Sequence, residues 1–195
     1  MYRGKAIQIA EELKYLYENP KKKAIITDAD RSMLCNLLGR LFSYTNDSEK
    51  AERAFLDACK LYRQALDTER TPENESDYAM ICNNLAILHK KSGRLDEAEK
   101  LYLEALLICR RLVNEDCQAA YEPYVATICN NLANLYKKTG KLDKTEKLYQ
   151  EALSIRRRLV DEANRETYKA DVATSCNNLA DLYSDTGRPD EAERC

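Results

Sequence analysis

The chain has 195 residues, of which 33% are charged and 44% hydrophobic, with only five glycines and four prolines. So few turn-forming residues are typical of a helical protein. The formal net charge of −2 excludes a general electrostatic attraction to nucleic acid or to acidic membranes. No apolar run approaches the ~20 residues of a membrane-spanning helix, and the first residues lead into a charged amphipathic stretch rather than a signal-peptide core. We therefore expect a cytoplasmic protein whose partner is neither a membrane nor a nucleic acid.

Residues 1–34 are expected to form an unpaired helix followed by a link. The apolar residues of this segment match, in order and at an offset of 45 residues, those of a helix predicted after residue 50; they are Ala6, Ile9, Ala10, Leu13, Leu16 and Tyr17. Residues three and four apart lie on one face of a helix, so this pattern predicts an amphipathic helix. The chain thus begins on the equivalent of the second helix of a repeat.

A pentapeptide recurs at a fixed interval along the rest of the chain. Cys82–Ala86 reads Cys-Asn-Asn-Leu-Ala, and the same five residues return 47 positions later at Cys129–Ala133 and again at Cys176–Ala180. Cys35–Gly39 is a degenerate copy at the same interval. Such a period indicates a stack of similar units, each stabilised by its neighbours. We predict repeats at 35–81, 82–128 and 129–175 and a partial repeat at 176–195, which together make residues 1–195 a single array.

Each repeat is predicted to be an antiparallel helical hairpin. In the third repeat, apolar residues at spacings of three and four form one stripe from Val125 to Tyr136 and a second from Leu142 to Val160. Gly140 stands between the two stripes, where a glycine suits the left-handed cap at the C-terminus of a helix. Its counterparts in the other repeats are Asn46, Gly93 and Gly187.

The eight cysteines allow a disulfide, a zinc or a packing interpretation, and their spacing favours packing. Equivalent residues of stacked hairpins lie about one helix packing distance apart, ~8–10 Å, whereas a disulfide requires Cα atoms within about 7 Å. The cysteines that share one position of the repeat are Cys35, Cys82, Cys129 and Cys176, and we expect them to be buried. Cys59, Cys109, Cys117 and Cys195 share no position. The only histidine, His89, cannot complete a zinc site with them, so we expect no metal.

Enzyme signatures are missing from the sequence. It contains no glycine-rich phosphate loop, and one histidine cannot serve a nucleophilic triad beside the residues available. We therefore expect no catalytic residue, no cofactor and no enzymatic activity. Two basic runs, Arg110-Arg111 and Arg156-Arg157-Arg158, fall on the second helices of their repeats, where we expect a solvated outer face.

The order of small and large residues resembles a tetratricopeptide repeat. In the second repeat the pattern is carried by Leu85, Ala86, His89, Gly93, Ala98, Tyr102 and Ala105. The Asn-Asn-Leu-Ala core, the run from Tyr149 to Arg157 and the lead-in Asp171-Val172-Ala173 resemble the kinesin light chain type, and the run from Tyr121 to Ala126 resembles its lengthened bacterial version. The resemblance implies an all-α, right-handed superhelical solenoid of antiparallel helical hairpins that docks peptides. A period of 47 residues, against about 34 in the common repeat, implies longer helices.

The resemblance also implies that one stripe along the first helices lines the inner, concave surface of the array. The first position of this stripe is an unbroken column of asparagines, namely Asn36, Asn83, Asn130 and Asn177, and Asn134, Lys90 and Lys137 lie on the same stripe. An asparagine amide can both donate to and accept from the backbone of a bound peptide, and a lysine adds a contact to a carboxylate. We take these seven as candidate peptide-binding residues and expect a protein or peptide partner that is acidic or has a free C-terminus.

Two alternatives remain open for these side chains. The asparagines can instead bridge adjacent hairpins by hydrogen bonds, and the lysines can be solvated cations that complement helix C-termini. For the whole chain we predict a protein-interaction scaffold, and the alternative is a regulatory or oligomerisation segment that binds another part of a larger polypeptide. The short last helix from Pro189 leaves an apolar face uncovered, which would allow weak self-association through the C-terminal end.

Overall fold

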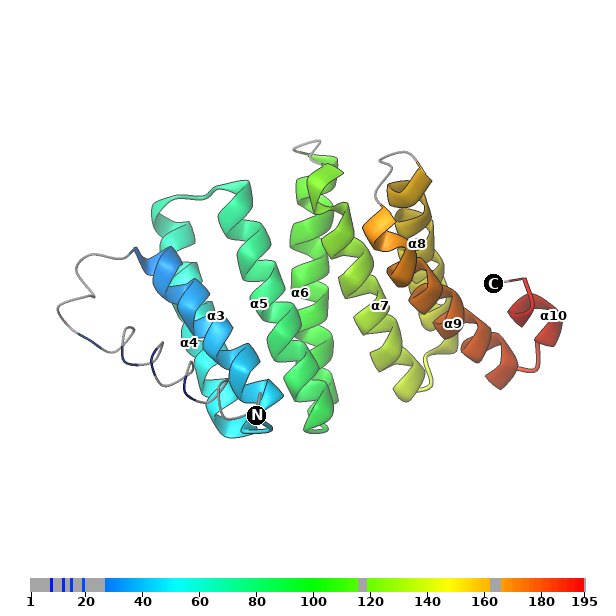
Figure 1. Cartoon of the computed structure of the whole chain (residues 1–195), viewed down its shortest axis with the longest axis horizontal. Coiled ribbons are helices and arrows are strands. Elements are labelled where there is room, and N and C mark those ends of the chain that lie inside the picture. Colours follow the sequence, from blue (N-terminus) through cyan, green and yellow to red (C-terminus); the bar gives the residue numbers. More distant parts are fainter. Residues whose placement is uncertain are drawn as a thin grey trace. The chain divides into compact units, whose positions relative to one another are not determined.

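The computed structural model describes residues 8, 12, 15, 19, 27–115, 119–161 and 166–194. Within these ranges the chain forms α-helices and two 3-10 turns, without a strand (Figure 1). The helices are α3 (Asp28–Tyr44), α4 (Ser48–Thr68), α5 (Pro72–Lys91), α6 (Leu95–Asn114), α7 (Glu122–Lys138), α8 (Leu142–Asp161), α9 (Lys169–Asp185) and α10 (Pro189–Ala192), and the turns are η1 (Ala119–Tyr121) and η2 (Glu166–Tyr168). The helix predicted over residues 6–17 lies outside the described residues, apart from Gln8, Glu12 and Tyr15.

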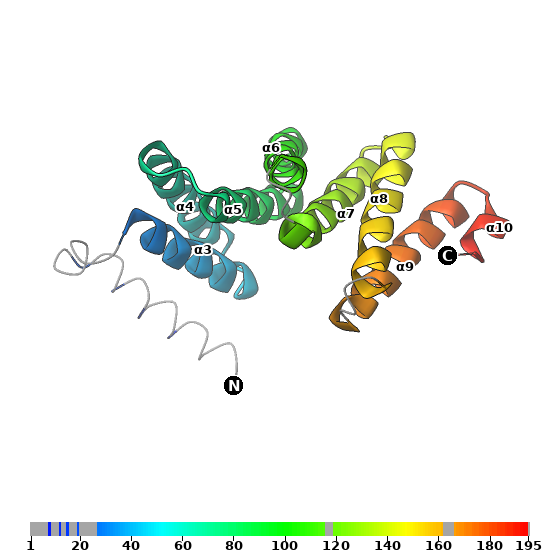
Figure 2. The ribbon, with the colours of Figure 1, turned by 90° about the horizontal axis from the view of Figure 1, so that it is seen from above.

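The helices pack as hairpins, which confirms the all-α fold class. The chain divides into two compact units, Met1–Ile108 and Cys109–Cys195. In the first unit α4 packs against both α3 and α5, and in the second α8 packs against both α7 and α9 (Figure 2). Below, α3, α5, α7 and α9 are called the first helices, and α4, α6 and α8 the second helices. The division falls within α6, so a single array over residues 1–195 stays a prediction.

The turn inside each hairpin has the left-handed residue that the sequence predicts. Asn46 has a φ of 61°, and Gly93, Gly140 and Gly187 have φ angles of 82°, 74° and 72°. The backbone N–H of Arg94, which follows Gly93, donates to the carbonyl of His89 at 2.9 Å. This bond reaches back over the helix end and satisfies a carbonyl that has no partner within the helix. A local steric preference therefore ends each first helix at the expected residue.

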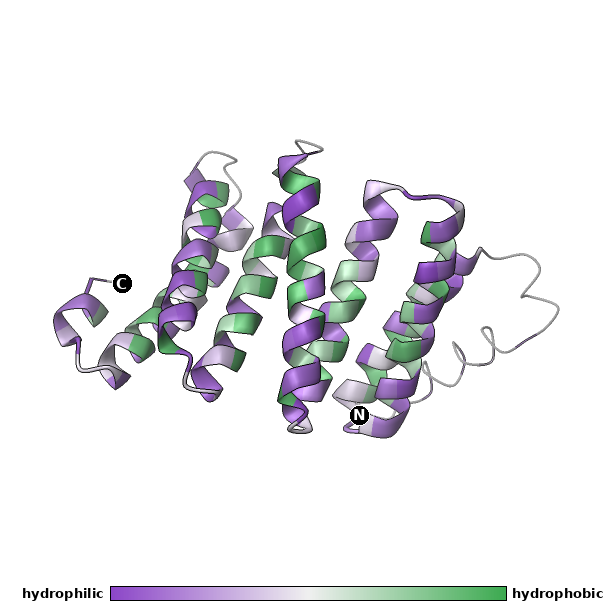
Figure 3. Ribbon diagram, turned by 180° about the vertical axis from the view of Figure 1, so that it is seen from behind, coloured by the Kyte–Doolittle hydropathy of each residue, from purple (hydrophilic) through white to green (hydrophobic). Residues whose placement is uncertain are grey.

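Small and large side chains alternate in the core between the helices. Ala86 and Ala133 are fully buried, and the rings of Tyr102 and Tyr149 are at most 1% exposed. Figure 3 shows the apolar residues as stripes along the helices, with hydrophilic residues on the remaining faces. Packing explains why the degenerate pentapeptide copy Cys35–Gly39 ends in glycine, because a Cβ on Gly39 would lie 2.5 Å from the ring of Phe55. A glycine therefore stands where the other repeats have alanine.

The shared cysteine position is buried, as predicted, in the first three repeats. Cys35, Cys82 and Cys129 are at most 1% exposed, whereas Cys176 is half-buried, and all four are free thiols. Burial raises the pKa of Cys129 to about 12, so its thiol is protonated and unreactive at neutral pH. Cys59 and Cys109 are also buried. Cys117 and Cys195 lie outside the described residues.

A repeated ion pair ties each of two hairpins to the hairpin before it. Glu52 of α4 accepts hydrogen bonds from Arg94 Nη1 at 2.5 Å and Nη2 at 2.7 Å, and it also contacts His89. In the second unit Glu146 of α8 accepts from Arg188 Nη1 at 2.7 Å and Nη2 at 3.2 Å. Each arginine directly follows the left-handed glycine of its turn. The turn that ends a first helix thus also anchors it to the preceding second helix.

The expectation of a solvated basic run on α8 is wrong for Arg156. This side chain is 6% exposed, and its Nη1 donates to Ser175 Oγ at 2.5 Å and to the backbone carbonyl of Asp171 at 3.1 Å. Arg157 and Arg158 are exposed, as expected. Arg156 is buried because α9 packs over this side of α8, and the hydroxyl and carbonyl of α9 replace the water that the guanidinium loses.

Candidate functional site

Asparagines of consecutive first helices bond to each other in both units. Asn84 Nδ2 of α5 donates to Asn36 Oδ1 of α3 at 3.0 Å, and Asn178 Nδ2 of α9 donates to Asn130 Oδ1 of α7 at 2.8 Å. In each pair, the second asparagine of one pentapeptide reaches the first asparagine of the preceding one. The bridging alternative for the asparagines therefore holds for Asn36 and Asn130, and each bond uses only the acceptor oxygen of these two amides.

The predicted asparagine column differs in depth from repeat to repeat. Asn83 and Asn130 are 2% and 9% exposed, Asn36 is half-buried, and Asn177 is exposed. Identical residues at identical repeat positions thus have unequal access to a ligand. Their depth depends on what packs around each helix, which the periodicity of the sequence does not reveal.

Asn134 is held by a second helix. Its Oδ1 accepts a hydrogen bond of 2.7 Å from the hydroxyl of Tyr149 on α8. Burial raises the pKa of Tyr149 to about 12, so the hydroxyl keeps its proton and remains a donor at neutral pH. The bond fixes the amide of Asn134, which is itself half-buried, in one orientation on the surface of α7.

The two candidate lysines lie in the last turns of their helices, where a cation complements the helix dipole. Lys137 Nζ forms an ion pair of 2.7 Å with Asp185 at the end of α9. Lys90 is half-buried at the equivalent place on α5. Asp185 is 61% exposed, and exposed ion pairs contribute little to stability. Little of the stability of the fold therefore depends on this ion pair.

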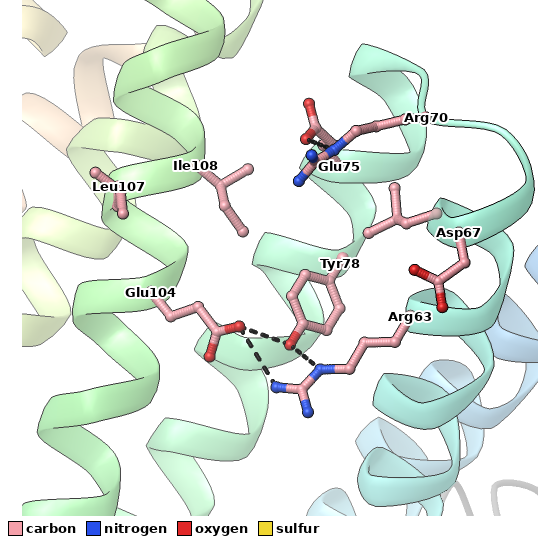
Figure 4. A pocket seen from close by; sticks show the side chains of 9 residues that line it. Arg63, Asp67, Arg70, Glu75, Tyr78, Glu104, Leu107 and Ile108 are labelled. Carbon is pink, nitrogen blue, oxygen red and sulfur yellow. Dashed lines mark hydrogen bonds and ion pairs between the residues drawn. The ribbon is translucent and has the colours of Figure 1, made fainter.

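A groove in the first unit was not predicted from the sequence. Two hollows of about 470 Å³ and 350 Å³ lie between α4 and α6 and share Arg63, Asp67 and Tyr78. Figure 4 shows the larger one. The hydroxyl of Tyr78 donates to Glu104 Oε1 at 2.7 Å and accepts from Arg63 Nε at 2.8 Å. Burial raises the pKa of Tyr78, which keeps this bridging hydroxyl protonated. We call this furrow the α4–α6 groove.

The polar bridge of the groove has a counterpart in the second unit. Arg110 and Glu151, each 47 positions after Arg63 and Glu104, form an ion pair of 2.6 Å. Val125 takes the place of Tyr78 there, and the arginine lies closer to the carboxylate than Arg63 does to Glu104, whose direct contact is 3.5 Å long. An arginine followed by a glutamate 41 residues later is therefore a sequence signal for contacts between second helices. Applied in advance, it would have indicated the walls of the groove.

In the part of the chain that the structure describes, no helix combines the length and the apolar character needed to cross a bilayer. The same residues contain no group of three or more histidine, cysteine, aspartate or glutamate side chains placed to hold a metal ion.

Solved structures share this fold. BtubC (BKLC) from P. vanneervenii is 27% identical over 99% of this chain and 70% of its own, with a TM-score of 0.74. A putative kinesin light chain of Podosopora anserina with nearly identical TPR-like repeats is 16% identical over 98% of this chain and 83% of its own, with a TM-score of 0.69. The apo form of RapI is 12% identical over 97% of this chain and 46% of its own, with a TM-score of 0.73. The first two of these neighbours bear out the resemblance to kinesin light chain repeats. Among curated proteins, none matches the chain.

Family models for the tetratricopeptide repeat match three parts of the chain, residues 34–65, 79–116 and 124–195. The matched parts contain the pentapeptide copies and the left-handed turns described above. Sequence period, hairpin packing and turn geometry thus agree with these matches, and the chain belongs to the tetratricopeptide repeat family.

Proposed function

We propose that the chain is a scaffold that holds a peptide segment of a partner protein along its first helices. Tetratricopeptide repeats generally serve as protein-protein interaction scaffolds, typically without catalysis. The observation that carries the proposal is the pair of side-chain hydrogen bonds that Asn84 donates to Asn36 and Asn178 donates to Asn130. These bonds hold neighbouring first helices in register and place equivalent polar residues beside each other, which suits the regular spacing of a peptide backbone.

The contacts to such a peptide would come from the more accessible of the seven predicted residues. Asn177 is exposed, and Asn36, Asn134, Lys90 and Lys137 are half-buried. Because only the acceptor oxygens of Asn36 and Asn134 are used by the bonds described above, their amide hydrogens can donate to ligand carbonyls. The deeper Asn83 and Asn130 would meet the ligand only where it approaches the helices most closely.

The proposed partner segment is acidic or ends in a free carboxylate. In the second unit a carboxylate of the ligand would take the place of Asp185 beside Lys137, with the Asn134 amide next to it on α7. Asp181 is exposed on α9 and would repel an acidic ligand at that position, which favours one direction of binding. Affinities in the micromolar range are expected, because ordering a flexible peptide opposes its contacts.

The experiment is affinity capture with the 195-residue chain, followed by tiling the recovered protein into short peptides and measuring their binding by fluorescence anisotropy. Asn177→Ala and Lys137→Ala should weaken the binding of the selected peptide, and the effect of Lys137→Ala should shrink at high salt. Asp185→Asn should strengthen its binding, since the competing carboxylate is gone. Arg157→Ala on α8 is the matched control. Loss of binding in this control alone would place the functional surface on the second helices.

A further inference from the structure

The α4–α6 groove is long enough to hold a short helix. Leu56, Lys60, Arg63 and Asp67 are spaced three and four residues apart on α4 and line one wall. At the helical rise per residue this wall is about 16 Å long from Leu56 to Asp67. The opposite wall is α6, and Tyr78 of α5 lies between the two walls (Figure 4). Leu85, also on α5, lines the smaller hollow. All of these residues belong to the first unit.

The rims of the groove present large apolar side chains to solvent. Leu56 on α4 is 50% exposed and Leu107 on α6 is 71% exposed. Half-buried Leu66, Leu101 and Ile108 continue the apolar surface into the two hollows. Single exposed leucines are common on proteins, but apolar residues that converge on one furrow are typical of an interaction surface.

The walls favour a helical occupant over an extended one. Both walls are α-helices, whose backbone groups are already bonded within the helix, so they offer no row of backbone donors and acceptors to an extended strand. An amphipathic helix satisfies its own backbone and needs only side-chain contacts, which is how apolar grooves between helices bind their ligands.

The charges along the groove are unevenly placed. The smaller hollow is lined by the cations Lys60 and Arg63 and by one carboxylate, Asp67. The larger hollow has two cations, Arg63 and Arg70, against three carboxylates, Asp67, Glu75 and Glu104. Arg63 and Asp67 line both hollows, so the two ends differ through Lys60 at one end and through Arg70, Glu75 and Glu104 at the other, where carboxylates outnumber cations. A ligand with opposite charges at its two ends would match this pattern in one orientation only.

From these features we propose that the α4–α6 groove docks an amphipathic helix of a partner protein. This helix has large apolar side chains at spacings of three, four and seven residues, a carboxylate near Lys60, and a cation near Asp67 and Glu104. The groove opens between the second helices α4 and α6 over a floor from α5, and it is lined by none of the seven residues proposed above to bind a peptide. A partner can thus engage it whether or not the first helices are occupied.

The probe is a yeast-displayed library of helical peptides of roughly 14 residues, or about four turns. Glutamate is fixed in the first turn and lysine in the last, which also suits the helix dipole, and the apolar face is randomised among Leu, Ile, Met, Phe and Ala. Selection against the full chain should enrich large apolar residues along one face. Affinity for an enriched peptide should fall at least about tenfold in Leu107→Glu, because a charge then lines the apolar rim.

Leu103→Glu is the matched control, because Leu103 lies on the same helix and is 45% exposed but lines neither hollow. This variant should bind as the unchanged chain does, and circular dichroism should show both variants folded. Lys60→Glu should weaken binding most at low salt, whereas Asn177→Ala should have no effect, which separates this surface from the first helices. The proposal is overturned if no large apolar residues are enriched or if enriched peptides bind Leu107→Glu undiminished. It is equally overturned if sedimentation shows that the chain is a dimer and that the Leu107→Glu variant is a monomer, since the groove is then occupied by a second copy of the chain.

Discussion

Tyr149 of α8 donates a hydrogen bond of 2.7 Å to Asn134 of α7 and thereby joins the two helices of one hairpin. Tyr102 occupies the equivalent position 47 residues earlier and is fully buried, but its hydroxyl has no hydrogen-bond partner among the described residues. The residue equivalent to Asn134 in that hairpin is Ile87. A single difference between repeats therefore separates a satisfied buried hydroxyl from an unsatisfied one.

Removing the two hydroxyls should have opposite consequences for stability. Tyr149→Phe should lower the free energy of unfolding by about 0.5–1.5 kcal/mol, because it breaks a hydrogen bond. Tyr102→Phe should leave it unchanged or raise it slightly, because a buried hydroxyl without a partner is destabilising. In an Ile87→Asn background, Tyr102→Phe should become destabilising. Urea denaturation measures all of these variants, and equal losses for both tyrosines in the unchanged background would contradict the contrast.

Two adjacent asparagines of α9 should affect different properties. Asn178→Ala removes the donor to Asn130, which is 9% exposed, so we expect a loss of about 1–2 kcal/mol in the free energy of unfolding. Asn177 is exposed, so Asn177→Ala should change stability by less than about 0.5 kcal/mol. The same two proteins can be compared by chemical denaturation and by peptide binding. A stability loss confined to Asn177→Ala would refute the assignment of the bridge.

The ion pair between Glu146 and Arg188 should make stability depend on acid pH. Hydrogen bonding from Arg188 lowers the pKa of the Glu146 carboxyl below its ordinary value of 4.5, although burial opposes the shift. The folded chain then binds this proton less tightly than the unfolded chain, so the pair stabilises the fold above about pH 4.5 and ceases to do so as the pH falls further.

Glu146→Gln should accordingly lower the thermal midpoint at pH 7, and the gap to the unchanged chain should narrow by pH 3. Glu52→Gln should behave in the same way, because Arg94 lowers the pKa of Glu52 by the same kind of bond. Glu49→Gln, at an exposed position of α4, serves as the control and should shift the midpoint little. Calorimetry across this pH range measures the effect, and a gap that is constant with pH would show that these ion pairs do not contribute.

The buried cysteines should resist labelling in the native protein. Cys82 and Cys129 are fully buried, and the neighbouring Cys59 thiol together with burial raises the pKa of Cys82, as burial does for Cys129. An aromatic disulfide reagent at pH 8 should modify both residues only after denaturant is added, whereas half-buried Cys176 should react sooner. Mapping of labelled peptides by mass spectrometry distinguishes the sites. Fast native labelling of Cys129 would disprove its burial.

Much of the local structure could be predicted from the sequence. The stripes at spacings of three and four predict the helices, and glycine at 93, 140 and 187, with asparagine at 46, predicts the left-handed turns that end the first helices. These features depend on residues within a few positions of each other, where sterics and hydrogen bonding are local. The 47-residue period adds which hairpins are equivalent, and hence that the cysteine position is buried.

Contacts between repeats depended on the tertiary structure. Asn36 meets Asn84, Glu52 meets Arg94, and Arg63 meets Glu104 across 48, 42 and 41 residues. Each pair forms because hairpin packing brings together side chains that the sequence leaves far apart. Single differences between repeats, such as Tyr78 against Val125 or Ile87 against Asn134, then change which side chains form hydrogen bonds with each other. The burial of Arg156 follows from the same packing. The sequence by itself determined the apolar stripes of the helices and the turns that end the first helices, because those are local and periodic properties. Only the packing of helix on helix decided which polar groups pair with each other and which side chains outside the stripes, such as Arg156, are buried.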